Sequence, residues 1–192
     1  MKKIPYGIAD YKDIAENNYY FIDKTKFIEK LESLNERYLI FLRPRRFGKS
    51  LFISMLHYYY DIHYKNNFKT LYGNTYIGNT PTKEVNRYLI MRFNFSALDT
   101  NDIEESFRKY IVLRMNSFIK KYDLDIEKDN NPIILFNHIF TYAEENKLEL
   151  MILIDEYDNF ANKLLLREKT EYLGLVSEKT ASFKQFFTIL KT

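Results

Sequence analysis

Three short apolar segments carry the pattern that is typical of buried strands. They are residues 38–42, 88–96 and 148–154, and each is rich in aromatic or β-branched side chains. Stretches with helical periodicity separate them, so strands and helices alternate along the chain. This alternation predicts an α/β fold, a three-layer α/β/α arrangement around a mainly parallel sheet.

Helix signals surround these segments. Apolar residues spaced by three and four positions predict a helix from about residue 51 to 60. Capping residues predict four more helix starts, which are Asp10, Asp23 or Thr25, Thr100 or Asn101, and Asn131 followed by Pro132. Two further helices are predicted at residues 159–167 and 178–191. Clustered Gly, Asn and Pro predict irregular structure at residues 65–82, and a charged stretch predicts a flexible loop at 120–131.

The strongest chemical signal lies between the first predicted strand and the helix after it. Residues 43–50 read RPRRFGKS and bring Gly48, Lys49 and Ser50 to a helix N-terminus, where unpaired N–H groups favour an anion. In a phosphate-binding P-loop, glycine lets the backbone approach, lysine reaches the phosphates and serine holds Mg²⁺. The general pattern has glycine where Arg43 stands. The competing interpretation is a chance G-K-S before a surface helix.

A second signal ends the third predicted strand, where Asp155 and Glu156 follow an apolar run. Ligands of open α/β sheets bind at the carboxyl ends of the strands, so these acids are expected beside the P-loop. Asp155 is then expected to support Mg²⁺, and Glu156 to act as a general base toward water. A strand that simply ends in solvated acids is the alternative.

These residues also resemble a known family. RPRRFGKS is similar to the phosphate loop of the bacterial and archaeal AAA-ATPase-like family, in which arginine replaces the first glycine as a rule. Residues 4–8, 20–25 and 154–158, which read IPYGI, YFIDKT and IDEYD, are similar to its other markers. Longer members often carry a C-terminal PD-(D/E)XK nuclease-like domain.

The resemblance implies a P-loop NTPase fold with ATP and Mg²⁺ as cofactors. It assigns Lys49 and Glu156 to catalysis, and Ser50 and Asp155 to the metal. The expected nucleotide-binding residues are Arg43, Pro44, Arg45, Arg46, Phe47, Gly48, Lys49, Ser50 and Leu51. Residues 20–25 are a candidate wall for the adenine, although we favour the simpler interpretation that they begin a capped surface helix.

The domain expected from this pattern spans residues 1–192, with a helical lead-in at 1–37 and a nucleotide-binding core at 38–192. Related ATPases place a sensor strand between the P-loop strand and the strand that ends in acids. No such strand is visible in the sequence. We therefore expect an incomplete sheet, in the N-terminal part of a longer protein or in a truncated copy.

Composition narrows the function classes. The formal net charge is +3, from 29 basic and 26 acidic residues, and this is too small to argue for nucleic acid by itself. The absence of cysteine excludes disulfides and thiolate zinc sites, and it agrees with a reducing cytoplasm, which is the expected location. The longest apolar runs are far too short to span a membrane.

Three functions remain open. The first is a Mg²⁺-dependent ATPase, and the second is a nucleotide-dependent interaction module that hydrolyses ATP slowly or not at all. The third is a nucleic-acid backbone binder that uses Arg43, Arg45, Arg46 and Lys49. A nucleic-acid or protein partner is expected to act through the missing C-terminal region, and the sequence does not indicate an oligomeric state.

Overall fold

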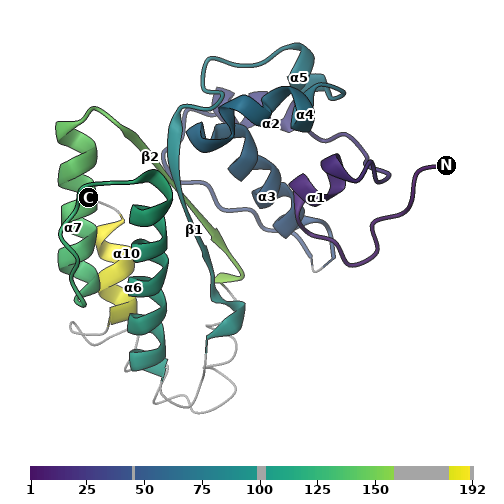
Figure 1. Ribbon diagram of the computed structural model, residues 1–192. Coiled ribbons are helices and arrows are strands. Elements are labelled where there is room, and N and C mark those ends of the chain that lie inside the picture. Colours follow the sequence, from purple (N-terminus) through teal and green to yellow (C-terminus); the bar gives the residue numbers. More distant parts are fainter. Residues whose placement is uncertain (45, 99–102, 158–181, 191–192) are drawn as a thin grey trace. The chain divides into compact units, whose positions relative to one another are not determined.

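A computed structural model describes residues 1–44, 46–98, 103–157 and 182–190 (Figure 1). The chain forms two compact units, Met1–Ile90 and Met91–Thr192, and each is described by itself. Several predictions lie outside the described residues. They concern the helix at 159–167, the cap at Thr100 or Asn101, Arg45, and both ends of the helix at 178–191.

The first unit is helical. Its elements are α1 (Tyr11–Glu16), α2 (Lys26–Ser33), α3 (Lys49–Tyr60), the 3₁₀ helix η1 (Ile62–Asn67), α4 (Phe68–Tyr72) and α5 (Tyr76–Asn79). The predictions of α1, α2 and α3 are confirmed, and Asp10 caps α1 by accepting the N–H of Asp13 at 3.1 Å. The prediction of irregular structure at residues 65–82 is wrong for η1, α4 and α5. Leu71, Tyr72 and Ile77 are buried there, and this packing outweighs the local turn-forming residues.

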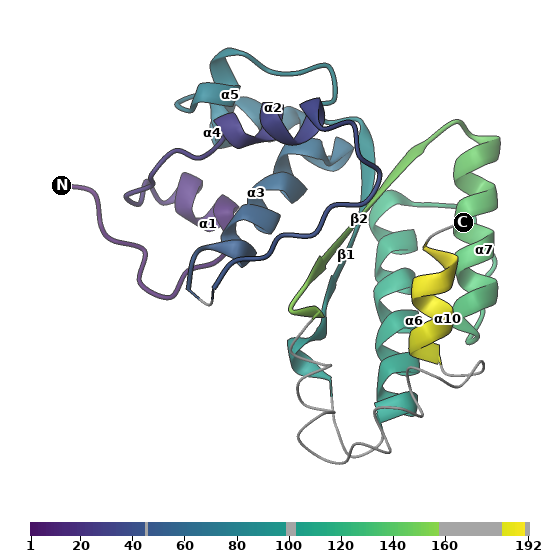
Figure 2. The ribbon, with the colours of Figure 1, turned by 180° about the vertical axis from the view of Figure 1, so that it is seen from behind.

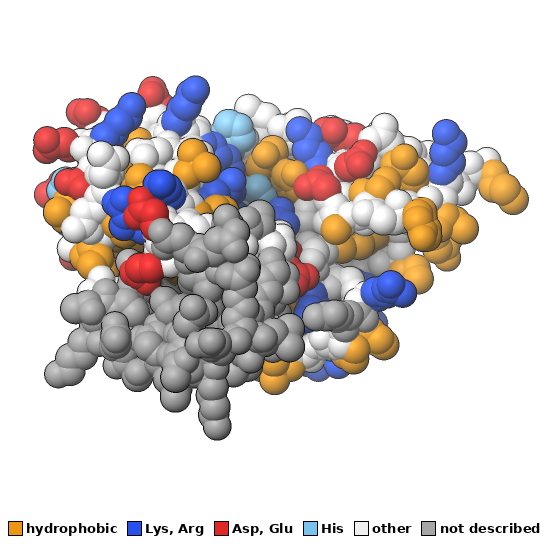
Figure 3. Space-filling view, turned by 90° about the horizontal axis from the view of Figure 1, so that it is seen from below, with side chains coloured by type: hydrophobic (Ala, Val, Ile, Leu, Met, Phe, Trp, Pro, Cys, Tyr) orange, Lys and Arg blue, Asp and Glu red, His pale blue; other side chains and the backbone are white. Residues whose placement is uncertain are grey.

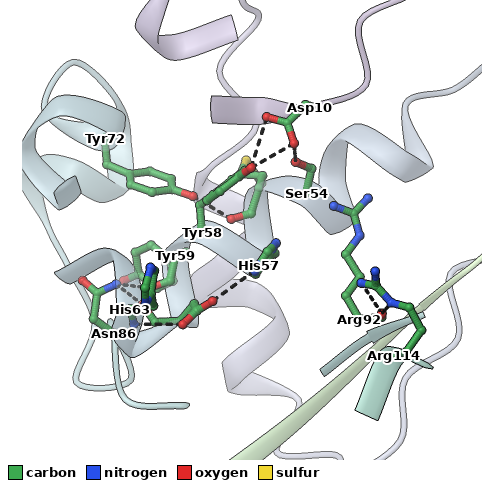
Figure 4. Close-up of polar contacts among 12 residues, drawn as sticks. Asp10, Ser54, His57, Tyr58, Tyr59, His63, Tyr72, Asn86, Arg92 and Arg114 are labelled. Atoms are coloured by element: carbon green, nitrogen blue, oxygen red, sulfur yellow. Dashed lines mark hydrogen bonds and ion pairs between the residues drawn. The ribbon is translucent and has the colours of Figure 1, made fainter. Parts of the chain in front are cut away.

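Residues near the N-terminus hold α3 in place. The hydroxyl of Tyr58 donates to Asp10 Oδ2 at 2.9 Å, and the hydroxyl of Ser54 donates to the same oxygen at 3.3 Å (Figure 4). The backbone N–H of Tyr11 donates to Ser54 Oγ at 2.9 Å. Ser54 is fully buried, so its hydrogen bond with the N–H of Tyr11 forms out of water. The helix that follows the RPRRFGKS segment is therefore anchored through its central turns.

Buried tyrosines form the core of the first unit. The rings of Tyr11 and Tyr72 stack with their centroids 5.0 Å apart. The Tyr72 hydroxyl donates to the carbonyl of Met55 at 2.6 Å, and the Tyr11 hydroxyl donates to the carbonyl of Leu71 at 2.8 Å. Burial raises the pKa of both tyrosines well above the usual value. The core thus buries large aromatic surfaces without leaving these hydroxyl groups unpaired.

The prediction of a buried strand at residues 38–42 is wrong in this structure. The segment has no strand assignment, and Tyr38, Ile40 and Leu42 are 58%, 73% and 75% exposed. Among the described residues, none pairs with this segment in a sheet. An apolar run becomes a buried strand only when neighbouring strands bind its N–H and C=O groups. Phe41 instead packs its ring against Phe52 of α3, with centroids 5.3 Å apart.

The described part of the second unit contains most of the sheet and three α-helices. The chain enters it within β1 (Tyr88–Asn94) and continues through η2 (Phe95–Ala97), α6 (Ile103–Tyr122), α7 (Pro132–Glu145), β2 (Glu149–Asp155) and α10 (Ser182–Ile189). Strands β1 and β2 pair in a parallel sheet, so both strand predictions are confirmed. Asn131 caps α7 as predicted by accepting the N–H of Ile133 at 2.9 Å, with Pro132 in the first turn.

Helices α6, α7 and α10 pack side by side, as views from both sides show (Figures 1 and 2). Phe186 of α10 is buried between them. Its ring contacts the rings of Phe93, Phe107 and Phe136, with centroids 5.1, 5.6 and 5.7 Å away. These partners come from β1, α6 and α7. Phe186 therefore packs β1, α6 and α7 together within the described part of the second unit.

Candidate functional site

The RPRRFGKS segment ends at an uncapped helix N-terminus. Gly48 is the residue before α3 and has a left-handed backbone with φ 78°, and Arg46 is left-handed with φ 67°. The N–H of Phe52 donates to the carbonyl of Gly48 at 2.9 Å, which makes it the first N–H paired within the helix. Three N–H groups precede it, those of Lys49, Ser50 and Leu51, and no side chain of the described residues caps them. This geometry fits an anion.

Left-handed residues also have a direct role in anion binding. They occur in the concave backbone turns, called nests, in which successive N–H groups face one anion. Glycine adopts φ near 78° without the steric penalty that other residues incur, and an added Cβ on Gly48 would meet no atom within 4 Å. The glycine is therefore required for its backbone conformation, and space alone does not explain it.

The cations of this segment have no acidic partner in the described part of the chain. Arg43 and Arg46 are exposed and Lys49 is half-buried, and none of the three forms an ion pair there. The phenyl ring of Phe47 is also exposed. Three uncompensated positive charges around free helical N–H groups attract phosphate. Arg45 lies outside the described residues.

Asp155 ends β2 and is 2% exposed. Its Oδ1 accepts the backbone N–H of Glu156 at 3.0 Å. Among the described residues, no donor lies within hydrogen-bond distance of the buried Oδ2. A buried carboxylate oxygen without a hydrogen bond is costly unless a cation compensates it. Because Mg²⁺ prefers such oxygen ligands, the carboxylate of Asp155 fits a metal ligand.

Glu156 follows with a left-handed backbone at φ 55°. This conformation is uncommon for a residue with a side chain, and outliers of this kind gather at functional sites. The side chain is half-buried, and its carboxylate forms no hydrogen bond or ion pair with another described side chain. The backbone turn thus separates two neighbouring carboxylates, of which one is buried and the other reaches solvent.

The predicted site residues fall into two halves. Residues 43, 44 and 46–51 lie together at the start of α3 in the first unit, and this group includes the predicted metal ligand Ser50. Asp155 and Glu156 lie together at the end of β2 in the second unit. Within the described ranges, no group of three or more His, Asp or Glu side chains forms a complete metal site. A metal at Asp155 would therefore need ligands beyond these side chains.

The sequence analysis missed Arg92. This residue lies on β1, and its Nη2 is 4.0 Å from Asp155 Oδ2. Arg114 of α6 donates to the carbonyl of Arg92 through Nε at 3.1 Å and through Nη2 at 3.0 Å (Figure 4). The sequence contained a signal for this residue, because Arg92 is the one charged residue within the apolar run of β1. A charge in a buried strand calls for a partner.

The YFIDKT segment has a structural role that was expected neither from a wall for the adenine nor from the start of a capped surface helix. Asp23 Oδ1 accepts the hydroxyl of Thr25 at 2.6 Å, and Oδ2 accepts the N–H of Tyr76 at 2.7 Å. The fully buried Thr25 hydroxyl accepts the N–H of Ile77 at 3.1 Å. Burial by itself would raise the pKa of Asp23, but these hydrogen bonds outweigh it and lower the pKa. The segment joins the start of α2 to the start of α5.

Comparison with known proteins decides the family. The model of a family described as "Predicted AAA-ATPase" matches residues 5–192. This chain belongs to the AAA-ATPase-like family. Membership implies a P-loop fold, in agreement with the mixed α/β structure and the parallel sheet, and it indicates nucleotide binding.

Other comparisons are shorter. An "Uncharacterized protein in vnfD 5'region" of Azotobacter chroococcum mcd 1 is 46% identical over 56 residues. That match covers 29% of this chain and 11% of the relative, so the chain corresponds to a small part of that protein. No solved structure gives a significant match.

The described surface adds two observations. On the face drawn in Figure 3, hydrophobic, basic and acidic side chains are interspersed. In the described part of this AAA-ATPase-like chain, no helix combines the length and the apolar character needed to cross a membrane.

Proposed function

We propose that this AAA-ATPase-like chain binds ATP with Mg²⁺ and hydrolyses it. One observation carries the proposal, the uncapped N-terminus of α3. There, left-handed Gly48 precedes three N–H groups that no described side chain caps, and Lys49 lies in the first turn. Phosphate is the ligand that this combination of N–H groups, helix dipole and lysine binds best.

Each residue then has a distinct role. The nucleotide phosphates contact the backbone of residues 43–51, and the Lys49 ammonium group binds the terminal phosphates. Ser50 and Asp155 hold Mg²⁺, which when bound neutralises charge on the phosphate oxygens. Glu156 orients a water molecule and accepts its proton as a general base. Glu156 is half-buried and reaches solvent beside the buried Asp155, which supports these separate roles.

The proposed fold is a three-layer α/β/α P-loop domain with a mainly parallel sheet. Strands β1 and β2 are part of this sheet, and the carboxyl end of β2 carries the acids. Ligands bind at that edge in open α/β sheets, because the carboxyl ends of parallel strands share it. The proposal therefore places water activation by Glu156 at the carboxyl edge of the sheet.

A steady-state assay of phosphate release tests the proposal. The purified chain is incubated with ATP or GTP, with and without Mg²⁺, and binding is measured in parallel by calorimetry. We expect Mg²⁺-dependent release that is faster with ATP. Binding without turnover would support a nucleotide-dependent interaction module instead. Absence of both would overturn the assignment of the P-loop.

A second candidate function is binding of a nucleic-acid backbone. The guanidinium groups of Arg43 and Arg46 favour it, because they are exposed, form no ion pair with a described residue, and arginine binds phosphate bidentately. A titration with single-stranded and double-stranded DNA at several salt concentrations tests this candidate. A steep loss of affinity with salt, removed by Arg43→Ala, would support it. Binding that Arg43→Ala leaves intact would exclude this site.

A further inference from the structure

The carboxylate of Asp155 has a charge that its hydrogen bonds do not compensate. Within the described ranges, only Oδ1 receives a hydrogen bond, from the N–H of Glu156. Oδ2 is buried and accepts none from the described residues. Water does not reach this oxygen freely, because the side chain is 3% exposed. A nearby positive charge therefore offsets part of the cost of burying this carboxylate.

Arg92 supplies that charge from the neighbouring strand. Its Nη2 lies 4.0 Å from Asp155 Oδ2, within the range of an ion pair and beyond that of a hydrogen bond. The Arg92 side chain is 23% exposed, so solvent screens the attraction only in part. Two hydrogen bonds from Arg114 to the Arg92 carbonyl fix the backbone of β1 at this position. The pairing is thus electrostatic and lacks a direct hydrogen bond.

We propose that Arg92 is a positioning residue that compensates the buried carboxylate of Asp155 while no metal is bound and opposes a divalent cation there. This inference rests on the proposed function, in which Asp155 is a metal ligand. A guanidinium group beside the carboxylate repels any metal that approaches it, and a free ion brings no negative charge to offset that repulsion. When a metal arrives bound to nucleotide, the negative charge of the phosphates offsets the repulsion from Arg92. Arg92 therefore favours loading of the metal together with nucleotide.

Metal binding without nucleotide tests this inference. Mn²⁺ is titrated into the protein, and its free-ion signal is followed by electron paramagnetic resonance. Arg92→Met keeps much of the length of the side chain and removes the charge, so we expect Mn²⁺ to bind about threefold to tenfold more tightly. Arg92→Lys keeps the charge and should retain the wild-type affinity. Arg87→Met, a matched change of an exposed arginine, should have no effect.

The same variants separate the inference from the proposed function. If Asp155→Asn weakens Mn²⁺ binding but Arg92→Met matches wild type, the role of Arg92 is wrong and the metal site stands. If Asp155→Asn leaves Mn²⁺ binding unchanged, Asp155 is not a metal ligand, and the proposed metal site fails.

Thermal unfolding of the metal-free protein gives a readout that needs no metal. Arg92→Met leaves Asp155 as an uncompensated buried charge, so it should lower the Tm. The double variant Arg92→Met/Asp155→Asn removes both charges, and it should recover part of that loss. Strictly additive losses in Tm would overturn the pairing.

Discussion

Asp23 and Tyr76 stand 53 positions apart in the sequence, and the N–H of Tyr76 donates to Asp23 Oδ2 at 2.7 Å. The next N–H, that of Ile77, donates to the buried hydroxyl of Thr25. The two successive N–H groups at the start of α5 are thus bound by the segment that precedes α2. A motif that resembles a family marker therefore has a structural role in the first unit.

Thr25→Val should destabilise the protein. The substitution preserves shape, removes the hydroxyl that donates to Asp23 and leaves the buried N–H of Ile77 without an acceptor. A loss of about 1–3 kcal/mol in the free energy of unfolding is expected from denaturant titration. Thr80→Val at the exposed end of α5 is the control, and it should cost less than about 0.5 kcal/mol. Equal effects of the two substitutions would contradict the role of Thr25.

Lys49→Ala should weaken Mg-ATP binding by roughly tenfold to a hundredfold. It removes one hydrogen bond to a charged phosphate, which is worth about 1.5–3 kcal/mol. Lys65→Ala, which removes the same charge from exposed η1, should leave the affinity unchanged. Calorimetry measures both. An unchanged affinity in folded Lys49→Ala would show that the P-loop is not the nucleotide site.

Glu156→Gln should bind ATP normally and turn it over slowly. The amide keeps the shape of the side chain but cannot accept the proton from water, so a loss of about 10²–10⁴-fold in kcat is expected. Glu145→Gln, at the exposed end of α7, is the matched control and should retain activity. If Glu156→Gln and wild type release phosphate equally fast, another residue is the base.

Two glycine substitutions should separate nucleotide affinity from stability. In Gly48→Ala the new Cβ meets no neighbouring atom, but alanine is strained at φ 78°. The substitution should therefore either cost about 1 kcal/mol in the free energy of unfolding or distort the loop, and in doing so weaken Mg-ATP binding. Gly78→Ala would put its Cβ 1.8 Å from the carbonyl oxygen of Tyr72, so it should destabilise the fold. Calorimetry and thermal unfolding measure the two effects. If Gly78→Ala weakened ATP binding and Gly48→Ala did not, the assignment of Gly48 to nucleotide binding would be wrong.

As the pH rises above about 4.5, the wild type should lose stability relative to the Glu32→Gln variant, which cannot ionise at this position. Burial raises the pKa of Glu32, although hydrogen bonds from Thr82 and Tyr60 lower it in part. The unfolded chain therefore loses this proton first, and stability is lost between the ordinary glutamate pKa of 4.5 and the raised pKa in the folded protein. Unfolding of both proteins from pH 4 to 7 measures this. An advantage of Glu32→Gln that shrinks with pH would contradict the shift.

Features with local signals could be predicted from the amino-acid sequence. Asp10 and Asn131 cap the helices that they were predicted to cap, because a cap depends on hydrogen bonds two or three residues away. The strands β1 and β2 were evident from apolar runs of the right length. Gly48-Lys49-Ser50 at the start of α3 and Asp155 at the end of β2 followed from the order of these elements.

Features that depend on residues distant in the sequence emerge only in the folded chain. The apolar segment 38–42 reads as a strand, but pairing requires a neighbouring strand, and no described segment provides one. The turn-forming residues before Pro81 could not reveal that Leu71 and Tyr72 would find a core to pack against. Nor could the sequence show that Arg92 lies beside Asp155. Burial and charge compensation depend on which groups the fold brings together, and no local pattern contains that information.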